Sequence, residues 1–163
     1  MKLDDKTGRS AAKIFLAAAI IVATFSVSCN KKCRALESTN SGLVVGLYDF
    51  KECFPYATFN STLIIDTDTG FANYQASHFK TCAAQLDAID FSKNVLLGFK
   101  TETHACNAAF HRNISIDTTA KTYTFTVTIE KCDGCGTQLM STNFLIGPKI
   151  PAGYQVNFVK KDP

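Results

Sequence analysis

Residues 122–131 read Thr-Tyr-Thr-Phe-Thr-Val-Thr-Ile-Glu-Lys, and this stretch decides the fold class. Apolar side chains occupy the odd positions from Tyr123 to Ile129, and threonines occupy the even positions between them. Strict alternation in β-favouring residues is typical of a strand that has one buried face and one face in water. The stretch therefore predicts a half-buried β-strand.

The stretch just before it repeats the alternation. Between Ala108 and Ile116 the even positions are apolar, except for Arg112. Residues 118–121 (Thr-Thr-Ala-Lys) form a short polar connection between the two alternating runs. Two such runs joined by a short loop predict an antiparallel hairpin over 108–131 with one solvated face.

Five further apolar runs are short and are bounded by Gly, Pro, Asn, Asp or Ser, which favours strands over helices. These runs are 43–50, 62–65, 95–99, 144–146 and 154–159. Pro148 and Pro151 predict that the chain leaves the sheet, or lies at its edge, over 144–151.

One helix is predicted between Thr69 and Phe79, with Asp68 as its N-terminal cap. Its buried face would carry Phe71, Tyr74, Gln75 and His78. The predicted fold is thus mainly β, a compact antiparallel sheet or sandwich with one short helix, closed by disulfides. An α+β arrangement is the alternative.

The first 28 residues have the pattern of a secretory signal peptide, with four basic residues followed by the uncharged run 14–28. A bilayer span needs roughly 20 apolar residues, and this run has 15. A cleaved signal is therefore favoured over a membrane anchor. Cys29 follows Ser-Val-Ser directly. The same three residues also fit an ordinary cleavage site, which would leave Cys29 a plain thiol.

The apolar run ending in Ser-Cys-Asn-Lys resembles the loose lipoboxes of Bacteroidetes lipoproteins, although Ser26 stands where that family usually has Leu. The resemblance implies that Cys29 carries lipid such as palmitate and that this lipid holds the protein on a membrane. Surface export in that group goes with acidic residues after the cysteine, whereas Asn30 and Lys31 are not acidic. The expected place is the periplasmic face of the outer membrane, with surface exposure left open.

Residues 89–98 and 148–158 resemble segments of small Bacteroidetes lipoproteins to which no activity is attached. The layout between them is also similar to the C-terminal domain of a bacterial protease-complex subunit that stabilises its partner protease. That similarity implies a partner-stabilising role and carries no site residue to this chain.

Three segments are expected: a signal peptide at 1–28, the lipidated Cys29 with a polar tether at 29–41, and one β-rich extracytoplasmic domain at 42–163. Residues 1–28 hold four basic and two acidic residues, so the net charge falls from +3 for the whole chain to +1 for the remainder. This balance gives no reason to expect a nucleic-acid partner.

Seven cysteines leave an odd one in a secreted protein. If Cys29 carries lipid, six remain, which can close three disulfides in an oxidising compartment. The six are Cys33, Cys53, Cys82, Cys106, Cys132 and Cys135. They allow 15 pairings. The favoured set is Cys132–Cys135, Cys82–Cys106 and Cys33–Cys53.

The Cys132-Asp-Gly-Cys135 motif carries the alternative function, a redox pair or, with His104 and Cys106, a metal site. A redox pair needs a βαβ context and a helix at its first cysteine, which Gly134 does not favour. No catalytic motif, cofactor or resident metal is expected. The leading hypothesis is a non-catalytic module that binds or stabilises an envelope protein, with the hairpin 108–131 in its contact surface.

Overall fold

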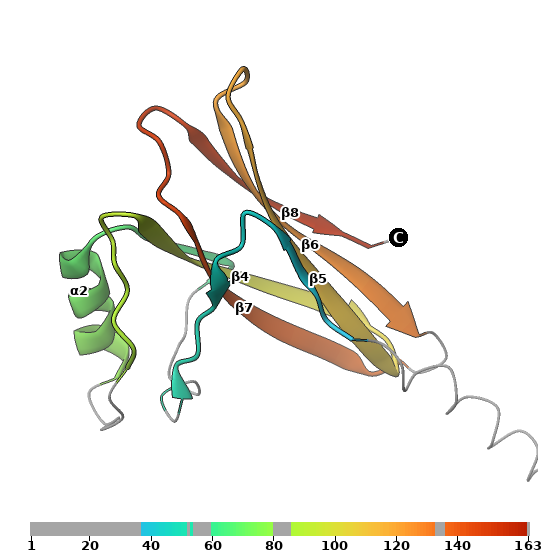
Figure 1. The fold of residues 1–163 in the computed structure, drawn as a ribbon. Coiled ribbons are helices and arrows are strands. Elements are labelled where there is room, and N and C mark those ends of the chain that lie inside the picture. Colours follow the sequence, from blue (N-terminus) through green and yellow to red (C-terminus); the bar gives the residue numbers. More distant parts are fainter. Residues whose placement is uncertain (1–36, 52, 54–59, 80–85, 133–135, 163) are drawn as a thin grey trace, which may run out of the picture. The chain divides into compact units, whose positions relative to one another are not determined.

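The computed structural model describes residues 37–51, 53, 60–79, 86–132 and 136–162. These residues belong to one compact unit that extends from Leu36 to Pro163. The described part is mainly β, with two four-stranded sheets and one short helix (Figure 1). This confirms the β-rich fold class.

The strands divide between the sheets as follows. The first sheet has the order β1 (Asn40–Gly42), β5 (Asn107–Asp117), β6 (Thr122–Cys132) and β8 (Gln155–Lys161). The second has the order β2 (Gly46–Leu47), β7 (Gln138–Pro148), β4 (Asn94–His104) and β3 (Thr62–Ile65). The second sheet is antiparallel, whereas β1 and β8 lie parallel to their neighbours in the first, so the antiparallel prediction holds in part.

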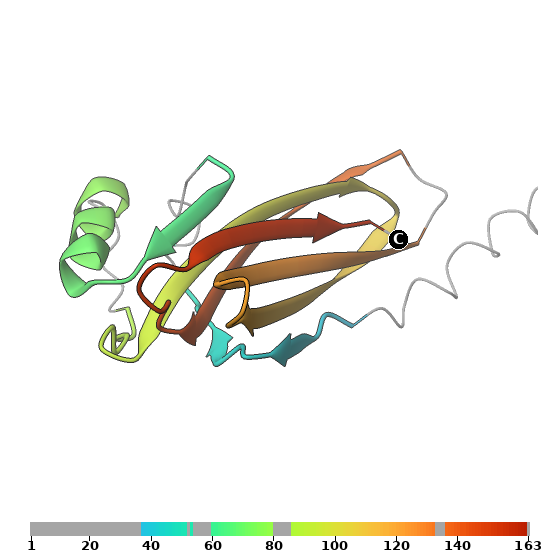
Figure 2. The same ribbon diagram turned by 90° about the horizontal axis from the view of Figure 1, so that it is seen from above.

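The predicted hairpin is present as β5 and β6, paired from Asn107 with Cys132 to Asp117 with Thr122. The four apolar side chains of β6 from Tyr123 to Ile129 are fully buried. They face the second sheet and pack with Val95, Leu97 and Phe99 of β4. The alternation therefore places the hairpin's apolar face in the core between two stacked sheets (Figure 2).

A second apolar core lies on the other face of the second sheet, around Leu96 of β4 and Phe144 of β7. It is covered by α2 (Asp68–His78), which lies at the end of the sheet where β4 begins (Figure 1). Phe71 and Tyr74 are buried, as predicted. The predicted cap is wrong by one residue, because the hydroxyl of Thr67 accepts the Gly70 N–H.

The run 43–50 does not form one strand. The chain passes instead from β1 in the first sheet to β2 in the second, and Tyr48 and Phe50 then turn into the core beside α2. Gly42 permits the crossing, since its φ is +66° and a Cβ there would collide with the carbonyl oxygen of Ile114. β7 continues to Pro148 between β2 and β4, so the prediction that the chain leaves the sheet or lies at its edge is wrong for 144–148.

Candidate functional site

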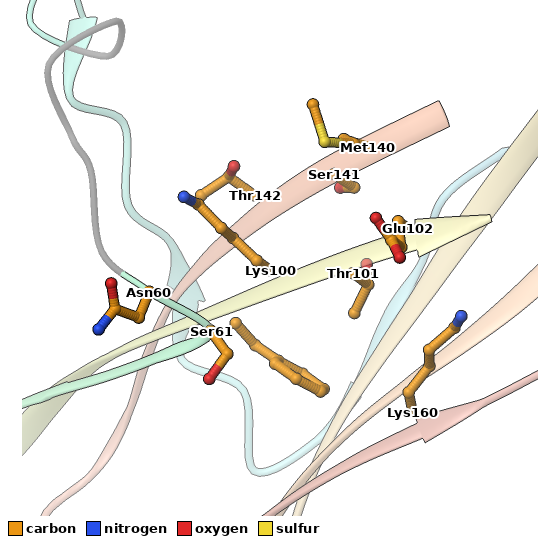
Figure 3. A pocket seen from close by; sticks show the side chains of 10 residues that line it. Asn60, Ser61, Lys100, Thr101, Glu102, Met140, Ser141, Thr142 and Lys160 are labelled. Atoms are coloured by element: carbon orange, nitrogen blue, oxygen red, sulfur yellow. The ribbon is translucent and has the colours of Figure 1, made fainter. Parts of the chain in front are cut away.

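A groove of about 450 Å³ opens beside β4, beyond Thr62, which is the first residue of β3 (Figure 3). β3 pairs with β4 as far as Thr62 opposite Phe99, and the carbonyl oxygen of Ser61 then accepts the Lys100 N–H at 2.9 Å. Among the described residues, β4 from 101 to 104 pairs with β7 alone. The groove is lined by Asn60, Ser61, Phe99, Lys100, Thr101, Glu102, Met140, Ser141, Thr142 and Lys160.

The backbone of β4 presents hydrogen-bonding groups to this groove. Successive residues of an antiparallel strand point their N–H and C=O groups to opposite neighbours. The Lys100 N–H points toward the β3 side, so Glu102 and His104 point the same way. β4 therefore has an open strand edge at 102–104, within the described part of the chain.

The groove combines an apolar spot with charges from both sheets. Met140, in register with Glu102, is 78% exposed, and Phe99 packs below against the rings of Phe125 and Phe158. Figure 3 shows β4 and β7 side by side, with Lys160 entering from β8. The arrangement suits an extended polar segment that carries an apolar side chain.

Beneath the groove lies a buried polar network around Asn143, which is 1% exposed. Its Nδ2 donates to the carbonyl oxygen of Phe99 at 3.0 Å and to Oγ1 of Thr101 at 3.2 Å. Its Oδ1 accepts from Nε of Arg112 at 2.6 Å and from the hydroxyl of Ser141 at 3.2 Å. One amide thus connects β4, β5 and β7.

Arg112 lies on the core-facing side of β5, opposite the fully buried Val127. Burial lowers the pKa of its guanidinium. It lines a second pocket of about 310 Å³ with Leu47, Tyr48, Asp49, Thr142, Asn143 and Phe144. Burial, with the nearby Asp87 charge, raises the pKa of Tyr48 to about 12.

The polar face of the hairpin β5–β6 is present, but β1 and β8 pair with much of the hairpin's two outer strand edges. Thr124 and Thr126 are partly exposed and lie beside Asn157 and Val159 of β8. β8 pairs with β6 along 122–128, and β1 pairs with β5 along 112–114. A strand cannot add to the paired parts of this hairpin. β8 itself is an edge strand that ends in Lys160 and Lys161, and charges of this kind discourage pairing.

The cysteine predictions fall partly outside the described residues, which exclude Cys29, Cys33, Cys82 and Cys135. Cys53, Cys106 and Cys132 are each disulfide-bonded. No disulfide joins any two of these three. The Cys106 N–H donates to the Cys132 carbonyl at 3.1 Å, so these two residues lie at adjacent strand ends. Each favoured pairing has one cysteine outside the described part and remains a prediction.

The histidines do not come together. His78 stacks on Tyr74, with the ring centroids 4.3 Å apart, whereas His104 is exposed at the end of β4. His111 contacts Thr39 and Glu130 on the outer face of the first sheet. Within the described ranges, no three His, Cys, Asp or Glu side chains group so that they could hold a metal ion.

Comparison of the chain with protein-family models, curated proteins and solved structures finds no match. In the described part, no helix is both long and apolar enough to cross a membrane. The support for the candidate site therefore comes from the geometry of this chain.

Proposed function

We propose that this chain is a lipid-anchored envelope protein whose β-rich domain binds a partner protein and does not catalyse a reaction. The partner would contribute an extended segment that adds to the second sheet beside β4. The observation that carries this proposal is the open edge of β4 at 102–104, next to a groove of about 450 Å³. Main-chain hydrogen bonds would supply affinity, and side-chain positions in the groove would supply specificity.

The groove indicates what the segment would carry. Met140 is largely exposed and offers an apolar contact, while Glu102 and Lys160 place opposite charges along the same opening. A segment with alternating side chains would point one set at Met140 and the other toward the floor formed by Phe99 and Thr101. A partner-stabilising role, such as the one the remote similarity implies, fits this mode of binding.

Site-specific cross-linking tests the location. A photoreactive amino acid at Met140 should give one discrete adduct in envelope extract, because that side chain stands at the open edge. The matched control is Ser115, which is exposed on the outer face of the first sheet. An identical adduct from position 115, or none from position 140 despite partner capture, would show that the groove is not the binding surface.

Lipidation of Cys29 is the proposed means of membrane attachment. Radiolabelled palmitate should enter the wild-type protein and should not enter Cys29→Ala, because only the thioether-linked form of Cys29 provides the acylated N-terminus. Gel fluorography measures the label, and N-terminal analysis should show loss of residues 1–28. Equal labelling of both proteins would exclude this attachment.

Closure of the domain by three disulfides is proposed from the even count left after Cys29 and from the bonded state of Cys53, Cys106 and Cys132. Intact mass should lie about 6 Da below the all-thiol value, two hydrogens for each bridge. Free thiols in the native protein, or stoichiometric zinc by elemental analysis, would instead favour a redox or metal role for Cys132 and Cys135.

A further inference from the structure

Arg112 is a charged side chain in an apolar position. Its even-numbered neighbours on β5, Phe110 and Ile114, both pack into the core between the sheets. Arg112 is partly buried, so its charge loses part of its hydration, and buried charges normally acquire a partner of opposite charge. Packing alone therefore does not explain why an arginine occupies this core-facing position.

The hydrogen-bond donors of Arg112 are only partly used. A guanidinium has five N–H donors. Nε donates to Oδ1 of Asn143 at 2.6 Å, and Nη1 donates to the carbonyl oxygen of Phe110 at 3.2 Å. Three donors have no acceptor among the described residues, and no described carboxylate forms an ion pair with Arg112.

Asp49, the acidic residue that lines the same pocket, accepts a hydrogen bond from another residue. Its Oδ1 accepts the backbone N–H of Lys51 at 2.7 Å, and its side chain is exposed. Arg112 and Asp49 line the same pocket of about 310 Å³. The pocket thus has room for a small group next to the guanidinium.

We propose that this pocket binds a carboxylate, with Arg112 as its charge partner and Asn143 as the residue that orients the guanidinium. Arginine binds carboxylates in a bidentate manner, through two parallel N–H groups. The bond from Nε to Asn143 fixes the plane of the guanidinium and leaves the terminal N–H groups for the ligand. Leu47 and Phe144 provide an apolar wall for whatever carries the carboxylate.

This pocket differs from the open edge of β4. It lies toward β2, whereas the open edge of β4 faces β3, although Thr142 lines both pockets and Asn143 connects Arg112 to the floor of the groove. The carboxylate pocket can therefore be real whether or not a strand adds beside β4, and the two proposals can fail independently.

The test uses the full chain, labelled with ¹⁵N-arginine and purified in detergent, titrated with sodium acetate against sodium chloride at equal ionic strength. The sequence has three arginines, Arg9, Arg34 and Arg112, of which Arg9 is expected to be lost with residues 1–28, and Arg112→Lys identifies the relevant Nε–H signal by its loss. Acetate should shift the Arg112 signal saturably and leave the others unmoved. A linear response, or the same response to chloride, would overturn the proposal.

Two peptides distinguish the sources of the carboxylate. One ends in a free carboxylate and has no acidic side chain, and the other is amidated and carries one internal aspartate. Saturation by the first identifies a chain terminus, saturation by the second identifies a side chain, and saturation by acetate alone identifies a small molecule. Saturation by none of the three probes overturns the proposal.

Two variants complete the test. Asp49→Asn removes a negative charge that repels acetate in the pocket, and it should tighten acetate binding by about threefold. Arg112→Gln should abolish the rise in Tm that acetate gives the wild type, because that rise depends on binding to the native state. If acetate leaves the wild type unchanged while Asp49→Asn alone moves the Arg112 signal, Asp49 is the counter-ion and the proposal is wrong.

Discussion

Replacing Glu102 with proline should weaken capture of the proposed partner strongly and leave the domain folded. The Glu102 N–H points toward the open edge of β4, so proline removes a donor that an added strand would use. The ladder to β7 uses the odd-numbered residues and stays intact. The loss of affinity should be about tenfold or more, equivalent to ~1.4 kcal/mol. It can be measured as loss of the adduct formed from Met140 and by titration with the identified partner.

Two controls bracket this result. Glu102→Ala removes the same carboxylate and keeps the N–H, so it should retain most of the binding. Thr103→Pro removes an N–H that points to β7 inside the sheet, and it should destabilise the fold by about 3 kcal/mol or more. Full-strength binding by folded Glu102→Pro would rule out strand addition at this edge.

Replacing Asn143 with leucine should lower the free energy of unfolding by about 3 kcal/mol, because it removes a buried amide that hydrogen-bonds to groups on β4, β5 and β7. Leucine has the same branched shape and is not smaller than asparagine, so a cavity does not explain the loss. The groups that lose a hydrogen bond are Nε of Arg112, the hydroxyl of Ser141, Oγ1 of Thr101 and the carbonyl oxygen of Phe99. Urea unfolding followed by circular dichroism gives the value.

The double variant Arg112→Met with Asn143→Leu separates this cause from packing. Removing both partners leaves no charge stranded between the sheets, so the double variant should be more stable than Asn143→Leu alone. If the two losses simply add, the amide and the guanidinium do not act as a pair.

The sequence predicts the hairpin well because its alternation is strong over both strands. The sequence does not predict the second half of β4, because the residues after Phe99 read Lys-Thr-Glu-Thr-His and contain no apolar run. Those residues still form a strand, because Thr101 and Thr103 are buried against the other sheet while Lys100 and Glu102 face water. Polar residues on a buried face cannot be recognised from hydrophobic periodicity.

The sequence does not predict the groove for a related reason. The groove exists because β3 is much shorter than β4, and the relative length and register of distant strands are not written in either segment. Arg112 can be recognised in the sequence as unusual, because it interrupts an otherwise apolar series at the even positions of β5. Asn143 cannot be recognised in this way, because its importance depends on contacts with two other strands.

The position of β1 and β2 affects the order in which this domain can fold. Asn40 pairs with Arg112, and Gly46 pairs with Ile146, so both early strands wait for partners made much later. Pairings this distant in sequence form slowly, because loop-closure entropy must be overcome first. When the chain emerges from its N-terminus, β1 stays unpaired until β5 is available, and β2 stays unpaired until the end of β7 is available. The second sheet can therefore be completed only after the last residues of β7 are available.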